Sequence, residues 1–210
     1  MKILFQGDSI TDVGRNRNTS YSLGMGYPLL VGARLGLKYP GRFEFENLGI
    51  SGNRVVDLYA RVKCDFWNHT PDVLSILIGV NDVWHEVSHQ NGVEADRFET
   101  VYRMLLRDTL ARFPKMKILL MEPFVLRGGA TDGNWEYFET ETARRAEITK
   151  ALADELGLVF LPLQKRLSEA ALTQPASYWL GDGVHPTPAG HQLIADAWID
   201  AFEREILPAL

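Results

Sequence analysis

The segment Val73–Val80, VLSILIGV, is almost unbroken in its apolar character, and it constrains the fold of this chain more than any other feature. A strand that is apolar on both sides needs cover on both faces, as a central strand of a parallel sheet has. Four more short runs, each closed by turn residues, are predicted to be strands at 3–5, 43–48, 117–121 and 158–161. Apolar residues at helical spacing predict helices at 26–37, 55–66, 95–113, 137–156, 165–172 and from Pro188 onward.

Strands that alternate with helices indicate βαβ units and a parallel sheet. A length of 210 residues suffices for one full core, and we find no linker or internal repeat. We therefore expect one domain over 1–210, an α/β protein built as a three-layer α/β/α sandwich with about five parallel strands. Right-handed crossovers then bring the turns after the first three strands to one edge of the sheet. The segments 12–22, 83–92 and 124–133 are expected to be loops.

Charge and composition narrow the class of function. Lys and Arg total 22 against 27 Asp and Glu, a net charge of −5, which argues against nucleic acid or an anionic membrane as a partner. The apolar runs are all shorter than the roughly 18 residues of a membrane span, and strand residues begin at once without a leader-like segment. The single cysteine, Cys64, excludes an intrachain disulfide. These features predict a cytoplasmic protein, and they leave a homo-oligomer open.

Four blocks of polar residues and glycine lie where strands or loops deliver them to the same edge of the sheet: GDSI at 7–10, GN at 52–53, GVND at 79–82 and DGVHP at 182–186. Ser9 comes directly after the first strand, at the position where open α/β sheets bind their ligands. We interpret Ser9 as a nucleophile. The alternative is that Asp8 or Ser9 only caps a following helix.

Acyl transfer by a serine hydroxyl makes demands that these blocks can meet. The hydroxyl needs a base, for which His185 is suited, and Asp182 can reach round one turn to hold the second ring nitrogen. The oxyanion of the tetrahedral intermediate needs preorganised donors. The backbone N–H groups of Ser9 and Gly52 and the side-chain amide of Asn81 would supply three, and Gly52 has no Cβ to obstruct a substrate.

These four blocks, in this order, resemble the SGNH subgroup of the GDSL-type serine esterases and lipases, with GDSI as a variant of GDSL. The resemblance covers nearly the whole chain. It implies a flavodoxin-like sandwich that needs neither a cofactor nor a metal. It also implies a catalytic triad of Ser9, Asp182 and His185, with Gly52 and Asn81 as oxyanion donors beside the Ser9 N–H.

Longer strings point to one branch of that family. The segments GDSITDVGR, NLGISGNRVVDLYARV, PDVLSILIGVNDVW and DGVHPTPAGH are similar to carbohydrate acetylesterases, and to acetylxylan esterases in particular. This similarity implies removal of acetyl groups from xylan or xylo-oligosaccharides. Gly181 stands where some relatives carry a bulky aromatic residue, which leaves the shape of the pocket open.

Aromatic and polar residues in the segments after the third and fourth predicted strands are candidates for sugar contacts: Trp84, Phe124, Arg127, Asp132 and Trp135. Aromatic faces beside polar groups suit sugar rings, although core packing explains isolated tryptophans as well. We take Asp8, Trp84 and Arg127 as candidate substrate-binding residues. The chain has few long apolar insertions near the site, which favours a small acyl group.

Two other functions stay open: a lysophospholipase or thioesterase that acts on longer acyl esters, and a carbohydrate-binding module without catalysis. Asp8 and Asp82 could form a carboxylate pair for glycoside chemistry, but we expect them to fix turns or a helix N-terminus. Ser51 is not expected to be a nucleophile, because Asn53 replaces the second glycine of a Gly-x-Ser-x-Gly elbow.

The remaining histidines have less specific interpretations. His85 and His89 have the four-residue spacing of a metal pair on a helix, but the sequence offers no third ligand, so we expect a solvated loop. His191 is expected to pack or to lie on the surface, and His69 to lie on a solvated face, as are Glu139 and Glu141.

Overall fold

A parallel sheet of five strands forms the centre of the computed structural model, which describes residues 1–19 and 21–210. The strand order is β2-β1-β3-β4-β5, and every pair of neighbours is parallel. The strands are β1 (Lys2–Gly7), β2 (Glu44–Asn47), β3 (Val73–Leu77), β4 (Lys117–Met121) and β5 (Val159–Leu161). The predicted fold class is confirmed. Of the expected loop over 12–22, Ser20 lies outside the described residues.

The α-helices are α1 (Ser9–Asp12), α2 (Tyr27–Lys38), α3 (Val55–Ala60), α4 (Val62–Asp65), α5 (Val80–His89), α6 (Ala95–Arg112), α7 (Trp135–Leu156), α8 (Gln164–Ala170), α9 (Ala176–Trp179) and α10 (Pro188–Ala201). Short 3₁₀ turns at Trp67–His69 and Asp132–Asn134 and a π-helical turn at Phe202–Ile206 complete the described elements, together with a last 3₁₀ turn at Leu207–Ala209.

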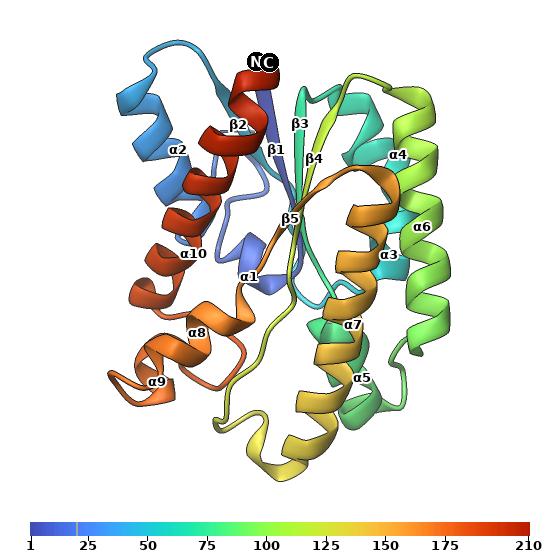
Figure 1. Cartoon of the computed structure of the whole chain (residues 1–210), viewed down its shortest axis with the longest axis vertical. Coiled ribbons are helices and arrows are strands. Elements are labelled where there is room, and N and C mark those ends of the chain that lie inside the picture. The colour runs from blue at the N-terminus through green and yellow to red at the C-terminus, as the bar shows by residue number, and fades with distance from the viewer. Residues whose placement is uncertain (20) are drawn as a thin grey trace.

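Helices cover both faces of the sheet because the strands are apolar on both faces. In β3, Val73 and Leu77 belong to one buried cluster, whereas Leu74 and Ile76 belong to the other. Helices α2 and α10 pack on the first face, and α3, α4, α6 and much of α7 pack on the second, as Figure 1 shows. A run such as VLSIL, without period-two alternation, is the sequence signature of this double burial.

The strand order places a topological switch between β1 and β3, because β2 lies on one side of β1 and the later strands lie on the other. Open α/β sheets bind ligands at the carboxyl ends of the strands at such a switch. The N- and C-termini lie together at the opposite edge, while α5, α8 and α9 lie at the carboxyl edge (Figure 1). The candidate site is therefore expected at the edge remote from the termini.

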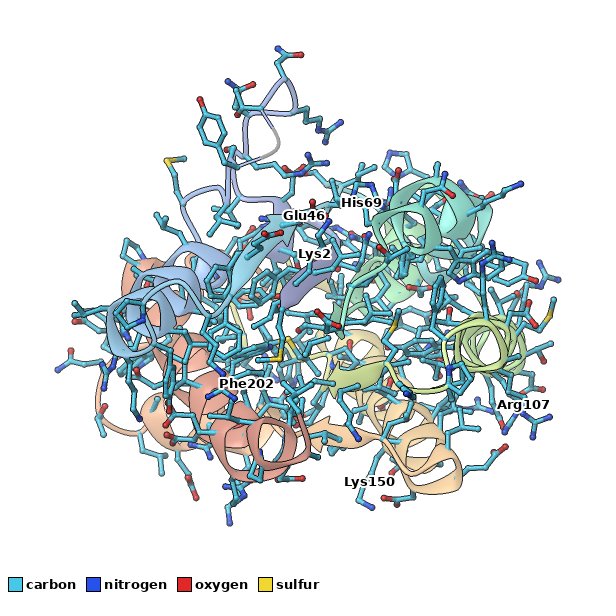
Figure 2. The ribbon with its side chains drawn as sticks, turned by 90° about the horizontal axis from the view of Figure 1, so that it is seen from above. Lys2, Glu46, His69, Arg107, Lys150 and Phe202 are labelled. Carbon is cyan, nitrogen blue, oxygen red and sulfur yellow. The ribbon has the colours of Figure 1, made fainter. Side chains whose placement is uncertain are left out.

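The edge with the termini carries charged pairs, which Figure 2 shows in a view from above. The Lys2 Nζ lies 3.2 Å from Glu46 Oε1, and the His69 Nδ1 lies 2.7 Å from Glu46 Oε2. His69 thus has an acidic partner at the end of the molecule opposite the candidate site, and it is not simply solvated as the sequence predicted.

The expected loop over 83–92 is wrong, because the structure has helix α5 there. The residues Val80, Val83, Trp84 and Val87 recur at helical spacing, and Val80 and Val83 are buried in the core. The solvent-exposed side of this helix carries Glu86, Ser88 and His89, so the polar residues of the segment obscure its apolar stripe in the sequence.

Smaller differences affect single elements. The predicted helix over 55–66 is divided into α3 and α4 at Arg61. Helix α9 was not predicted at all, since its four residues are too few for a periodic pattern. Thr187 caps α10, because its side chain accepts a hydrogen bond from the Gly190 N–H. Across the described residues, no helix combines the length and the apolar character needed to cross a bilayer; the cytoplasmic location stays a prediction.

Candidate active site

Ser9 opens helix α1 immediately beyond the carboxyl end of β1. Asp8 precedes it as the N-cap, and the Asp8 Oδ1 accepts a hydrogen bond from the Ile10 N–H at 3.0 Å. A capping carboxylate at this position fixes the turn and aims the next side chain out of the sheet edge. The two interpretations of this segment are thus compatible, because Asp8 caps the helix and Ser9 is the residue that the cap positions.

The loop that carries Asp182 and His185 is held by its own hydrogen bonds. The Gly181 N–H donates to the His185 carbonyl at 2.9 Å, and Leu180 and Pro186 form an antiparallel bridge. Within this loop the Asp182 Oδ1 accepts the N–H groups of Val184 at 2.9 Å and His185 at 2.8 Å. An aspartate that folds back onto the amides after it forms a compact turn. The sequence spacing Asp-x-x-His therefore produces a rigid pair.

Ser9, His185 and Asp182 form one continuous chain of hydrogen bonds. The Ser9 Oγ lies 2.9 Å from the His185 Nε2, and the His185 Nδ1 lies 2.7 Å from the Asp182 Oδ2. A carboxylate can only accept, so this geometry assigns the ring proton to Nδ1 and leaves Nε2 free to accept from the serine. The structure brings together all three residues that the sequence predicted for the triad.

The electrostatics of Asp182 suit a residue that stays ionised. Burial alone would raise the pKa of this carboxyl group, but the hydrogen bonds from His185 and Val184 outweigh it and hold the pKa below its usual value. A charged carboxylate beside the imidazole favours a proton on Nδ1 and stabilises an imidazolium if one forms.

Two of the predicted oxyanion donors are the backbone N–H of Gly52, in the turn after β2, and the side-chain amide of Asn81, after β3. Gly52 has a φ of 83°, a left-handed conformation that a residue with a Cβ adopts only with strain. Asn81 is 5% exposed in the first turn of α5, and its Nδ2 donates to the Asn53 carbonyl at 3.2 Å. This bond ties the Asn81 amide to the Gly52–Asn53 turn and leaves its second N–H for another acceptor.

Helix α5 contributes more to this region than the expected loop would have. Trp84 follows Asn81 by one turn, and its ring lies 5.6 Å from the His185 ring and 6.1 Å from the Phe138 ring, measured between centroids. Trp84 is therefore a packing partner of His185, and its remaining exposed edge is what could contact a substrate. The helical spacing of Val80, Val83 and Trp84 is the sequence signal that indicates this position of Trp84 beside the site.

The two carboxylates Asp8 and Asp82 are each 1% exposed. Both Asp82 oxygens accept the Val55 N–H, at 3.1 and 3.2 Å, which ties α5 to the start of α3. Burial raises the pKa of Asp8 to about 7 and the pKa of Asp82 well above its usual value. The geometry therefore favours a role in fixing turns for both residues, and it argues against a glycosidase pair. The prediction that Asp8 contacts the substrate is also not supported, because its buried side chain offers no surface to a sugar.

Arg127 lies on the loop after β4, which is fastened directly to the Asp182 loop. The Leu126 N–H donates to the Gly183 carbonyl and the Ala130 N–H to the Asp182 carbonyl, both at 2.8 Å. A Cβ on Gly128 would lie 2.5 Å from the Asp182 carbonyl carbon, so only glycine permits this contact. The Arg127 side chain is 66% exposed, and its guanidinium stacks on the Trp135 ring at 4.9 Å.

Beside this loop lies a groove of about 670 Å³ between α7, β5 and α8. Apolar side chains supply much of its wall, and Arg127, Glu139, Glu147 and Lys150 lie on it. Ser9, Asp182 and His185 are not among the residues that line the groove, so the groove is separate from the triad. The sequence did not predict this groove.

The sequence also did not predict the burial of Arg145, which donates to the Val93 carbonyl at 2.6 Å and pairs with Glu141. Glu141 is thus paired and not merely solvated.

Other candidates considered from the sequence have structural partners. The Ser51 hydroxyl donates to the Asp12 carboxylate at 3.0 Å. His191 is buried and accepts the Tyr27 N–H at 3.2 Å, and burial lowers its pKa to about 4, so it is a neutral packing residue. The part of the chain that the structure describes contains no group of three or more His, Cys, Asp and Glu residues arranged to hold a metal ion.

Comparison with known proteins agrees with this geometry. The family model for GDSL-like lipases and acylhydrolases matches residues 5–193. An acetylxylan esterase of Geobacillus stearothermophilus is 36% identical over 98% of this chain and 93% of its own length. The crystal structure of Axe2, an acetylxylan esterase from the same organism, superposes with a TM-score of 0.86 at 35% identity and covers 97% of this chain and 94% of that one.

Two further findings refine the comparison. A protein of Parabacteroides merdae described as a GDSL-like lipase superposes with a TM-score of 0.92 at 39% identity, covering 96% of this chain and 95% of that chain. Solved variants of Axe2 that are described as catalytic mutants replace a serine, an aspartate and a histidine by alanine. The sequence motifs, the fold and these relatives lead to one assignment: the chain belongs to the GDSL-like lipase/acylhydrolase family and is a carboxylic ester hydrolase.

Proposed function

We propose that this protein removes acetyl groups from xylan or xylo-oligosaccharides through an acyl-enzyme formed on Ser9. The observation that carries the proposal is the chain of hydrogen bonds from Ser9 to His185 to Asp182, at 2.9 and 2.7 Å. A serine whose hydroxyl faces the free nitrogen of an oriented imidazole is an activated nucleophile. A binding module without catalysis would have no use for that arrangement.

In the acylation step the Ser9 Oγ attacks the carbonyl carbon of the ester while the His185 Nε2 takes its proton. Asp182 holds the imidazole in the required tautomer and stabilises the imidazolium. His185 then gives the proton to the leaving alcohol, which departs and leaves the acetyl group on Ser9. Water, deprotonated by the same imidazole, releases acetate in the second step.

The oxyanion that forms in both steps would bind the N–H groups of Ser9 and Gly52 and the free N–H of the Asn81 amide. These donors come from three separate turns at the carboxyl edge, after β1, β2 and β3. Donors held by the fold need no reorganisation when the charge develops, and one of them is worth about 10²–10³ in rate.

The substrate class rests on the relatives and on the surroundings of the triad. The relative that is 36% identical is an acetylxylan esterase, and variants of Axe2 are described as an acetyl-xylooligosaccharide esterase. In its catalytic mutants the aspartate and the histidine are three positions apart, as Asp182 and His185 are here. We propose that the exposed Arg127 and the edge of Trp84 contact the sugar. The groove beside Arg127 could hold sugar units remote from the ester.

A hydrolase of longer acyl esters is the second candidate, since the groove between α7, β5 and α8 has apolar walls. Its lining does not reach the triad residues, so an acyl chain attached to Ser9 would have to leave the site to enter it. This argues for the smaller acyl group. The choice is tested by measuring acetate release across acetylated xylo-oligosaccharides and comparing kcat/KM for simple acetyl and octanoyl esters. A steep fall with acyl length supports the acetylesterase, and an increase supports the second candidate.

A further inference from the structure

The turn 126–131 after β4 lies with its backbone directly against the backbone of the catalytic loop. Two of its N–H groups, from Leu126 and Ala130, donate to the successive carbonyls of Gly183 and Asp182. Gly183 has a φ of 99°, and a Cβ on it would lie 2.6 Å from the Leu126 carbonyl oxygen, so this side of the contact also requires glycine. The turn therefore supports the peptide that carries the catalytic aspartate.

The hydroxyl of Thr131 closes this turn. It donates to the Leu126 carbonyl at 2.7 Å and accepts the Gly128 N–H at 3.0 Å, so that it uses both its donor and its acceptor capacity. The Thr131 N–H also donates to the Gly128 carbonyl, at 2.9 Å. Thr131 is 0% exposed, so loss of its hydroxyl would leave the Leu126 carbonyl without this buried partner. One side chain thus joins the two ends of the turn.

The beginning of the turn is fixed separately, by helix α8. The Val125 N–H donates to the Gln164 Oε1 at 3.0 Å, and the Gln164 Nε2 donates to the Val125 carbonyl at 2.9 Å. Val125 is itself buried. Because this end is held, a weakened turn would move mainly at its far end, where the Ala130 N–H supports Asp182. The Thr131 hydroxyl holds that far end in place.

We propose that Thr131 is a positioning residue for the catalytic triad and acts through the backbone of Asp182. The inference rests on the function proposed above, because it takes Asp182 as the residue that orients His185. One oxygen of Asp182 lies 2.7 Å from the His185 Nδ1, while the other accepts the Val184 and His185 N–H groups. A shift of the Asp182 peptide therefore moves the imidazole relative to Ser9. A displacement of about 1 Å can cost about 10²-fold in rate.

The experiment compares Thr131→Val and Thr131→Ser with the wild type on p-nitrophenyl acetate. Valine keeps the shape of the side chain but neither donates nor accepts, whereas serine keeps the hydroxyl. We expect Thr131→Val to lower kcat by about 10- to 100-fold, with KM changed by less than about 3-fold, since the substrate contacts stay in place. Thr131→Ser should keep kcat within about 3-fold of the wild type.

Thr149→Val is the matched control. Thr149 is also 0% exposed, and its hydroxyl donates to the Arg145 carbonyl at 2.8 Å within helix α7. This variant loses a buried hydroxyl of the same kind and should keep kcat within about 3-fold, whatever its melting temperature does.

The Nδ1 proton signal of His185, identified by its loss in His185→Ala, gives a readout that is independent of turnover. Thr131→Val should shift or broaden this signal, because the bond from Nδ1 to Asp182 changes. Thr131→Ser and Thr149→Val should leave it as in the wild type. A structural loss of stability alone would not produce this pattern in the folded protein.

Gly128→Ala tests the same support from the other side, whether or not Thr131→Val folds. Its Cβ would lie 2.5 Å from the Asp182 carbonyl carbon, so the catalytic loop must shift and kcat should fall as it does in Thr131→Val. Wild-type kcat in folded Thr131→Val or in folded Gly128→Ala would overturn the inference. So would a Thr131→Ser variant as slow as Thr131→Val, or an equal loss in Thr149→Val. A wild type that cleaves no ester would contradict the proposed function instead.

Discussion

Ser9 and His185 lie 176 positions apart in the sequence, and their side chains meet at 2.9 Å between Oγ and Nε2. The contact depends on the sheet, because β1 delivers Ser9 to its carboxyl edge and the loop before α10 delivers His185 to the same edge. The two residues come from opposite ends of the chain, so the whole fold positions the reaction.

Replacing His185 by alanine should lower kcat for ester hydrolysis by about 10³-fold or more, because the serine loses its base. His185 is partly exposed and its ring leaves no buried cavity, so the melting temperature should stay near that of the wild type. Steady-state kinetics on p-nitrophenyl acetate and a thermal melt test this prediction. Turnover near the wild-type value in this variant would rule out the triad.

Asp182→Asn should lower kcat by about 10³–10⁴-fold although it preserves the size of the side chain. The amide oxygen can still accept the backbone N–H groups of Val184 and His185. An amide nitrogen facing Nδ1 donates a proton, however, and so reverses the tautomer and presents Nε2–H to the serine. Kinetics together with a spectrum of the histidine ring protons measure both effects. A variant that loses less than about 10-fold would contradict the assigned tautomer.

Asn81→Ala should lower kcat by about 10²–10³-fold with a small change in KM, since the lost donor acts on the oxyanion and not on the ground state. The side chain also donates to the Asn53 carbonyl, so some of the loss could come from a displaced turn. Ser88→Ala, an exposed change on the same helix, serves as the control. An equal loss in both variants would show that the helix and not the amide is responsible.

Asp8→Asn tests the buried carboxyl group through stability. Burial raises the pKa of Asp8 from 3.8 to about 7 in the folded state, and Asp82 and His185 are the titratable groups that interact with it. Between these values the folded protein binds a proton that the unfolded chain has lost. The wild type therefore loses stability as the pH rises from about 4 to about 7, by about 1.4 kcal/mol per pH unit.

Asparagine cannot ionise and is an equally good N-cap, so Asp8→Asn lacks this dependence. The free energy of unfolding of the variant minus that of the wild type should be about 2–3 kcal/mol larger at pH 8 than at pH 5. Urea unfolding of both proteins at the two pH values measures the difference. An identical difference at pH 5 and pH 8 would mean that Asp8 is ionised in the folded protein.

The parallel sheet and the triad were predictable because both leave local patterns. Val73–Val80 is apolar without alternation, and Ser9, Gly52, Asn81, Asp182 and His185 stand in short blocks beside turn residues. Helix α5 is hard to predict from the sequence, because much of its surface is polar and Val83, Trp84 and Val87 form only a short apolar stripe. The consequence is large, since α5 brings Trp84 to His185.

Other features depend on contacts between segments that have no common pattern. The Arg127 loop is held by carbonyls of Asp182 and Gly183, which are more than fifty positions later in the chain. Arg145 and Glu141 look like residues of a solvated helix face, yet Arg145 is 2% exposed because its guanidinium reaches the Val93 carbonyl. Such pairings depend on the packing of helices, which a single sequence does not encode locally.

The hydrolysis of p-nitrophenyl acetate by the wild type and by Ser9→Ala, with melting temperatures measured alongside, tests the central claim most directly. We predict that the wild type releases acetate and that Ser9→Ala, folded equally well, loses at least about 10³-fold in kcat. A Ser9→Ala protein with turnover near the wild-type value would contradict the account, as would a folded wild type that cleaves no ester.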